Sequence, residues 1–146
     1  MYLVDTNVLS ASDPVALRSG EHGRVVDWLR RHRDHVFISS ITVAEIEAGI
    51  ARAKRRGATQ KAAEIEDWWR NTIIAHERRI LAFDMESATI AGRLYDAAIG
   101  RGHDPGFEDA AIAGIALRHG LQVVTRNTRH FKTLDVTFIN PYESAP

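Results

Sequence analysis

The segment Tyr2-Leu3-Val4-Asp5-Thr6-Asn7 lies near the start of the chain and combines a short apolar run with an abrupt polar end. An apolar run followed by Asp, Thr and Asn is typical of a buried β-strand that ends in a turn. The segment therefore predicts a first strand and places Asp5 at its carboxyl end.

Similar apolar runs recur along the chain and alternate with segments of helical periodicity. Further strands are expected at Val36–Ile38, Ile80–Phe83, Gln122–Thr125 and Val136–Ile139. Apolar residues spaced by three and four predict helices at residues 23–33, 42–56, 58–77, 87–99 and 107–118, while residues 126–131 are expected to form a polar turn. This alternation indicates an α/β fold: a parallel sheet of about four to five short strands with helices on both faces. We find no linker or repeat and expect one domain over residues 1–146.

The composition excludes several classes of protein. The chain has 146 residues, 45% of them apolar and 26% charged, which is ordinary globular usage. It contains no cysteine, which excludes disulfides, thiolate zinc sites and a cysteine nucleophile. The longest apolar run, Ala110–Leu117, has 8 residues, whereas a membrane-spanning helix needs about 20. Because Asp5 also interrupts any signal-peptide pattern, we expect a soluble, cytoplasmic protein without a membrane partner.

Acidic side chains accompany the predicted strand ends, where parallel sheets bind their ligands. Asp5 ends the first strand, Glu45 lies one turn into the helix after the second, and Asp109 lies in the first turn of the helix before the fourth. A hard divalent cation such as Mg²⁺ takes carboxylate oxygens and retains several waters. These three residues are therefore candidate metal ligands.

Each candidate also has a local structural explanation. Asp5 fits an Asx-turn, and Glu45 follows Thr42 by three residues, the spacing of a capping box. Asp109 favours the dipole at a helix start, but an apolar run follows it, so a carboxylate there is costly unless it is paired or metal-bound. Asp84, at the end of the third strand, is expected to cap the next helix.

Four short motifs resemble, in order, those of PIN domains. They are Leu3-Val4-Asp5-Thr6-Asn7, Thr42-Val43-Ala44-Glu45, Pro105 with Glu108-Asp109-Ala110-Ala111-Ile112-Ala113, and Val123-Val124-Thr125-Arg126-Asn127 with His130-Phe131. Their order, their spacing and the chain length are similar to small single-domain PIN toxins of bacterial toxin–antitoxin pairs, the VapC and FitB type. The resemblance covers nearly the whole chain.

The resemblance implies a ribonuclease that depends on Mg²⁺ or Mn²⁺ held by Asp5, Glu45 and Asp109. It also implies an RNA substrate, a homodimer and a small co-expressed antitoxin that inserts a basic side chain into the acidic pocket. Asn127 stands where the family often has a fourth carboxylate, which weakens the case for a second metal ion. We expect Thr6 and Asn127 to position water or metal ligands.

Two further features bear on RNA and partner binding. His130 is expected to pack or to contact phosphate rather than to bind the metal. Trp68 and Trp69 are adjacent, so they cannot share one helix face, and we expect one in the core and one at a dimer or antitoxin contact. The basic end of one predicted helix is either a solvated terminus favoured by the dipole or a rail for RNA phosphates; its residues are Arg52, Lys54, Arg55 and Arg56.

Two other functions remain open from the residues. A haloacid-dehalogenase-type phosphatase also has an aspartate after its first strand, but it needs a second one where this chain has Asn7. It also needs a well-placed lysine, and the chain offers only Lys54, Lys61 and Lys132. The second alternative is a catalytically inactive, metal-binding interaction module.

Overall fold

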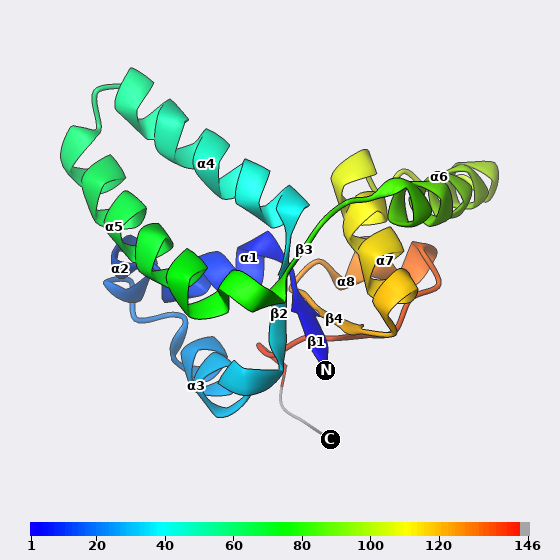
Figure 1. Cartoon of the computed structure of the whole chain (residues 1–146), viewed down its shortest axis with the longest axis horizontal. Coiled ribbons are helices and arrows are strands. Elements are labelled where there is room, and N and C mark those ends of the chain that lie inside the picture. Colours follow the sequence, from blue (N-terminus) through cyan, green and yellow to red (C-terminus); the bar gives the residue numbers. More distant parts are fainter. Residues whose placement is uncertain (144–146) are drawn as a thin grey trace.

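The computed structural model describes residues 1–143, and in them it contains one five-stranded parallel sheet (Figure 1). The strand order is β3-β2-β1-β4-β5. The strands are β1 (Tyr2–Val4), β2 (Val36–Ser39), β3 (Ile80–Leu81), β4 (Gln122–Val124) and β5 (Phe138–Ile139). β1 is central, with Leu3 in register with Phe37 of β2 and Val123 of β4. The predicted parallel α/β sheet is confirmed.

Helices cover both faces of this sheet. The α-helices are α1 (Thr6–Leu9), α2 (Pro14–Leu17), α3 (Gly23–Arg31), α4 (Ser40–Arg55), α5 (Thr59–His76), α6 (Met85–Gly100), α7 (Phe107–His119) and α8 (Thr128–Thr133). Short 3₁₀ turns lie at η1 (Ser10–Ser12), η2 (Arg33–His35) and η3 (Glu77–Arg79). Figure 1 shows α1–α5 on one side of the strands and α6–α8 on the other. Within residues 1–143, every helix is too short or too polar to cross a membrane.

The sheet separates two apolar cores. Leu3 is fully buried in a cluster that includes Ile112 and Phe131, whereas its neighbour Val4 is fully buried in a cluster that includes Ile38 and Trp69. Successive strand residues point to opposite faces, so this short strand contributes to both cores. The central strands β1, β2 and β4 are therefore mostly buried, whereas the edge strands β3 and β5 are only partly buried.

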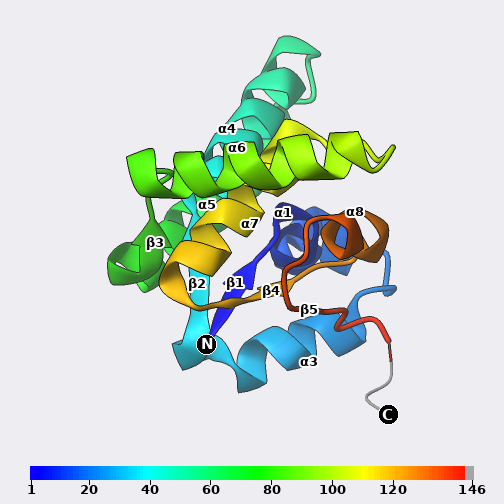
Figure 2. The ribbon, with the colours of Figure 1, turned by 90° about the vertical axis from the view of Figure 1, so that its right-hand side faces the viewer.

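A close helix pair supports one side of the sheet. α7 is buried from Ala110 to Ala116, and Figure 2 shows α6 lying across it. A Cβ atom on Gly114 would lie 2.4 Å from the carbonyl oxygen of Ser87 and 2.8 Å from Cβ of Ala91. Glycine is therefore what allows α7 to approach α6 closely, and the start of α7 is fixed by this packing.

The polar segments contain more helix than predicted. α8 occupies most of the region expected to be a turn, because Phe131 is fully buried and the amides of His130 and Phe131 donate to the carbonyl oxygen of Asn127. α1 likewise begins directly after β1. β3 and β5 are shorter than expected, with two residues each. Short helices and edge strands carry too little periodic signal to be recognised from sequence.

Asp84 has the predicted capping role. Its carboxylate accepts a hydrogen bond from the Ser87 amide at 2.9 Å, at the start of α6. The same carboxylate forms an ion pair with Arg118 of α7 at 2.9 Å. The capping bond and Arg118 hold its pKa below the ordinary value. Asp84 is thus occupied in joining α6 to α7.

Candidate active site at the carboxyl edge of the sheet

Asp5 is the most buried carboxylate of the candidate site. Its side chain is 4% exposed and lies between β1 and the first turn of α1. It accepts hydrogen bonds from the Thr6 amide at 2.7 Å, from Asn7 Nδ2 at 2.6 Å and from Thr125 Oγ1 at 2.7 Å. The first two bonds are local, since Asp5 is the N-cap of α1, whereas the third comes from Thr125, directly after β4. Asp5 therefore has both a local and a tertiary role.

Asp109 approaches the same edge from the first turn of α7. Its side chain is 17% exposed. Its Oδ2 accepts from Asn127 Nδ2 at 2.8 Å and lies 2.7 Å from Nδ1 of His130. Both partners come from the segment after β4. The carboxylate is therefore fixed by side chains rather than only by the backbone of its own helix.

Thr125 joins the two aspartates. While its hydroxyl donates to Asp5, it accepts from the Asn127 amide at 2.9 Å. The Asn127 side chain then donates to Asp109. This chain of bonds, from Asp5 through Thr125 and Asn127 to Asp109, links the end of β1 to the start of α7.

Glu45 reaches the site from the second turn of α4. The Thr6 hydroxyl donates a hydrogen bond to its carboxylate and also lies 3.1 Å from Thr42 Oγ1. The capping-box interpretation of Glu45 is wrong, because α4 begins at Ser40 and its cap is Ser39, whose Oγ accepts from the Thr42 amide at 3.0 Å. In the second turn, the backbone amides already bond within the helix. The Glu45 side chain is thus left to face Thr6.

The carboxylates of the site repel one another. Burial raises the pKa of Asp5 to about 6, and the charges of Asp109 and Glu45 add to this rise against the lowering effect of the Thr125 and Thr6 hydrogen bonds. Burial also raises the pKa of Asp109, opposed by its contacts with His130 and Asn127. Close, partly buried carboxylates of this kind favour a bound cation or proton.

The donor set suits a hard cation. Within residues 1–143, no three Asp, Glu or His side chains already converge on one point as a complete metal cage. Mg²⁺ does not require one, because it is usually held by one or two carboxylates together with waters and substrate phosphate. Asp5 and Asp109, with Glu45 opposite them, offer such oxygen ligands. The residues present therefore fit Mg²⁺ or Mn²⁺.

A groove leads away from Glu45 between α4 and α5. It has a volume of about 410 Å³, and Thr6, Glu45, Arg52 and Arg56 are among its lining residues. Lys54 and Arg55 do not line it, and Lys54 forms an ion pair with Glu66 of α5 at 2.8 Å. The structure thus brings only part of the predicted basic rail next to the carboxylates.

One of the two tryptophans of α5 lies in the core, as predicted, while a dimer or antitoxin contact of the other stays a prediction. Trp69 is 2% exposed and its Nε1 donates to Glu47 of α4 at 2.9 Å. Trp68 is half-buried and lines the groove beside Glu45. One tryptophan therefore belongs to the core and the other borders the candidate site.

Sequence reasoning missed two residues that orient the site. Thr125 was expected only as a strand residue, and Asn7 only as part of a turn, yet both donate to Asp5. Their positions directly after β4 and β1 were the one available signal. The direction of a hydroxyl or amide across the sheet edge is set by tertiary packing, so sequence alone did not show it.

Comparisons with known proteins agree with this geometry. The model of the PIN domain family matches residues 2–136. Toxin FitB of Neisseria gonorrhoeae is 34% identical over 97% of this chain and 99% of that protein. VapC ribonuclease Y4jK of Sinorhizobium fredii is 33% identical over 99% of this chain and its own full length.

A solved structure shows the same fold. The crystal structure of FitAcB from Neisseria gonorrhoeae has a TM-score of 0.85 at 34% identity, and the match covers 99% of this chain and 100% of that one. The match extends across the strands and helices that carry the carboxylates. We conclude that this chain belongs to the PIN domain family and is similar over its whole length to the FitB and VapC toxins.

Proposed function

We propose that this protein is the ribonuclease toxin of a toxin–antitoxin pair and hydrolyses RNA phosphodiester bonds at a site that holds Mg²⁺ or Mn²⁺. The observation that supports this most strongly is the hydrogen-bonded chain from Asp5 through Thr125 and Asn127 to Asp109. Independent helix caps would have no need of such a chain. The ribonuclease name of the VapC relative supports the same activity.

Some residues of the site would bind the cation, and others orient the side chains that bind it. Asp5 and Asp109 would hold the cation, and Glu45 would bind it or orient the attacking water. When bound, such a cation neutralises phosphate charge and lowers the pKa of a coordinated water. Thr6 fixes Glu45, while Thr125 fixes Asp5. Oriented ligands matter because loss of an orienting contact typically costs about 10–100-fold in affinity or activity.

Asn127 and His130 orient Asp109 rather than add charge. Both contact the same oxygen, Oδ2, which leaves Oδ1 of Asp109 for the cation. Asn127 is neutral, so the site has one negative charge fewer than a four-carboxylate site. We therefore expect one metal ion before substrate binds, with RNA phosphate supplying the remaining charge.

The groove beside Glu45 would guide the RNA. Arg52 and Arg56 line it together with Thr6 and Glu45. Their guanidinium groups suit phosphate oxygens. Trp68, half-buried in the same groove, offers an aromatic contact for RNA or for the antitoxin.

The proposed activity also has consequences for the partners and the location of the protein in the cell. An active ribonuclease endangers its own host, so we propose a small antitoxin that covers the carboxylates with a basic side chain. We also propose a homodimer, action in the cytoplasm and a single functional domain over residues 1–146. The toxin name of the FitB relative supports this cellular role.

Incubation of the pure protein with single-stranded RNA tests the activity. We expect cleavage with Mn²⁺ or Mg²⁺ and none with EDTA. Asp109→Asn should fold normally, as checked by circular dichroism. Its cleavage rate should fall by about 100-fold, the upper end of the 10–100-fold cost of a lost orienting contact, because a charged ligand is itself removed. Glu86→Gln is a matched control, because Glu86 of α6 pairs with Arg118 of α7 and contacts none of the three carboxylates of the site. Cleavage by the Asp109→Asn protein at the wild-type rate would contradict the assignment of Asp109 as a metal ligand.

The same preparation separates the alternatives. Release of phosphate from a small phosphomonoester without RNA cleavage would favour a phosphatase. Metal binding without either reaction would favour an inactive interaction module. Asn7 already argues against the phosphatase, because its side chain donates to Asp5 at 2.6 Å where that chemistry needs a second carboxylate.

A further inference from the structure

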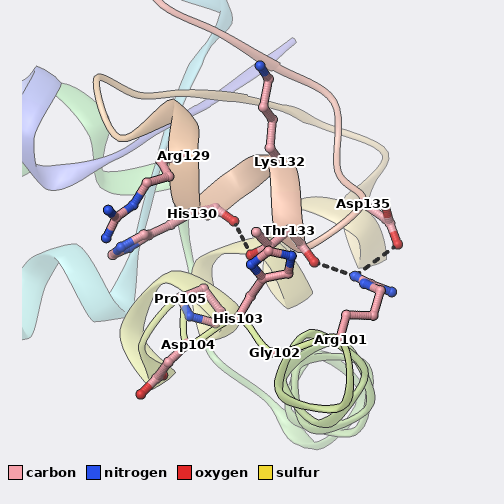
Figure 3. A pocket seen from close by; sticks show the side chains of 10 residues that line it. All are labelled: Arg101, Gly102, His103, Asp104, Pro105, Arg129, His130, Lys132, Thr133 and Asp135. Carbon is pink, nitrogen blue, oxygen red and sulfur yellow. Dashed lines mark hydrogen bonds and ion pairs between the residues drawn. The ribbon is translucent and has the colours of Figure 1, made fainter.

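A second cavity, lined by residues other than those of the Glu45 groove, lies beside the Asp109 end of the candidate site. It has a volume of about 610 Å³ and is formed by residues 101–105, by side chains of α8 and by Asp135 (Figure 3). This volume falls within the range of about 300–1,000 Å³ that is usual for ligand sites. Its wall includes His130, which also contacts Asp109 at 2.7 Å. The cavity therefore adjoins the candidate active site directly.

The ionic groups of this cavity leave an excess of positive charge. Arg101 is bound to Asp135 at 3.4 Å and to the carbonyl oxygen of Thr133. Arg129 and Lys132 are exposed and form no ion pair among the residues that the structure describes. The remaining carboxylate in the lining is that of Asp104, which accepts from the Tyr95 hydroxyl at 3.3 Å.

Arg129 is the cation of this cavity that directly precedes His130 in α8. Figure 3 shows its guanidinium group beside the ring of His130, on the same side of α8. His130 is in turn in contact with Asp109. An arginine at this place cannot serve as a metal ligand, and its planar fork of donors matches phosphate oxygens. Lys132 extends from α8 in a direction away from Asp104 and Pro105 (Figure 3).

We propose that this cavity, with Arg129 as its main contact, binds an RNA phosphate next to the one that is cut. The inference rests on the proposed ribonuclease function and extends it. Glu45 lines the groove, and His130, which contacts Asp109, lines this cavity, so the proposed RNA path runs along the edge of the sheet from α4 to α8. The scissile phosphate then lies at the carboxylates and the next phosphate along the strand lies at Arg129.

Steady-state cleavage of a short single-stranded RNA tests this assignment. Arg129→Gln should raise KM and leave kcat within about twofold, because the contact is made before and during the reaction alike. Each single-strand phosphate contact contributes about 0.7 to the slope of log affinity against log salt. The slope should therefore fall by about 0.7, which corresponds to about a fivefold rise of KM at 0.1 M salt.

Arg30→Gln is the matched control. Arg30 lies on α3, carries the same charge and is paired only with Asp27 at 3.5 Å on the surface. This substitution should leave both KM and the salt slope unchanged. It separates a specific phosphate contact from a general loss of positive charge.

Shortening the RNA one nucleotide at a time gives a second, independent readout. With the wild-type protein, KM should rise when the phosphate bound at Arg129 is removed, on one side of the cut only. With Arg129→Gln, removal of the same phosphate should leave KM unchanged. An equal rise of KM in both proteins, or an unchanged slope of log affinity against log salt in Arg129→Gln, would overturn the assignment of Arg129. The ribonuclease function would still stand. A loss of kcat with no change of salt slope would also overturn it, because Arg129 would then act on the scissile phosphate. Absence of any RNA cleavage by the wild-type protein would overturn both proposals.

Discussion

Asp5→Asn should remove a large pH dependence from the stability of the metal-free protein. Asp5 is 4% exposed and its pKa rises from the ordinary value of 3.8 to about 6, chiefly because of burial. A carboxyl group with a raised pKa holds its proton more tightly in the folded state than in the unfolded state. The contribution of Asp5 to the free energy of unfolding is therefore greatest below about pH 4 and falls as the pH rises through about 6.

The size of this effect follows from the two pKa values. One pKa unit corresponds to about 1.4 kcal/mol, so the rise to about 6 amounts to roughly 3 kcal/mol. Asparagine does not titrate, and it keeps one oxygen to accept from the Thr6 amide. It also loses the acceptor that Thr125 and Asn7 use. The loss of these two hydrogen bonds does not depend on pH. It therefore lowers the unfolding free energy of the variant by the same amount at every pH.

Urea unfolding in EDTA at several values between pH 4 and pH 7 measures the effect. The difference in unfolding free energy, wild type minus Asp5→Asn, should fall by roughly 3 kcal/mol across this range. Saturating Mn²⁺ should stabilise the wild-type protein near pH 7 and reduce this fall, because a ligand of the folded state adds to its stability. Parallel curves for the two proteins in EDTA would refute the reasoning, since Asp5 would then ionise without cost.

Three further substitutions test the orientation of the site, the packing behind it and the RNA path. Thr125→Val should lower RNA cleavage by about 10–100-fold, because it removes a bond that orients a metal ligand; Thr125→Ser should retain activity, and equal loss in both variants would contradict this role. Gly114→Ala should lower the free energy of unfolding by about 1–3 kcal/mol, because the added methyl group overpacks the contact with α6. Gly92→Ala, with open space around it, should raise the free energy of unfolding by up to about 1 kcal/mol. Thermal unfolding of both variants measures the difference. Arg52→Gln should weaken the salt dependence of KM, whereas Lys54→Gln should not, because its ion pair holds it outside the groove; kinetics at several salt concentrations decide between them.

Local patterns carried a large part of the fold. Short apolar runs with polar ends, such as Leu3-Val4 before Asp5, indicate strands buried on both faces, and their alternation with helices is compatible with few arrangements other than a parallel sheet. That rule also predicted that the residues after these strands would share one edge. The prediction holds because the direction of every strand in such a sheet is the same.

The helix ends show where local patterns were insufficient. Thr42 and Glu45 have the spacing of a capping box, but Ser39 caps the helix instead. Both arrangements satisfy the backbone equally well near a helix start, so sequence spacing does not distinguish them. The helix start was decided by β2, which continues through Ser39 and fixes where the chain turns.

The sequence by itself determined the class of fold and the order of the main elements, and it singled out Asp5, Glu45 and Asp109 as candidate ligands. These properties depend on neighbouring residues, whose apolar or polar character is read directly. Only the tertiary structure decided that Thr125 bonds to Asp5, that Asn127 and His130 hold Asp109, and that Arg129 lies beside them. Those contacts join segments far apart in the chain, and their distances depend on how closely the helices pack, as Gly114 shows for α6 and α7.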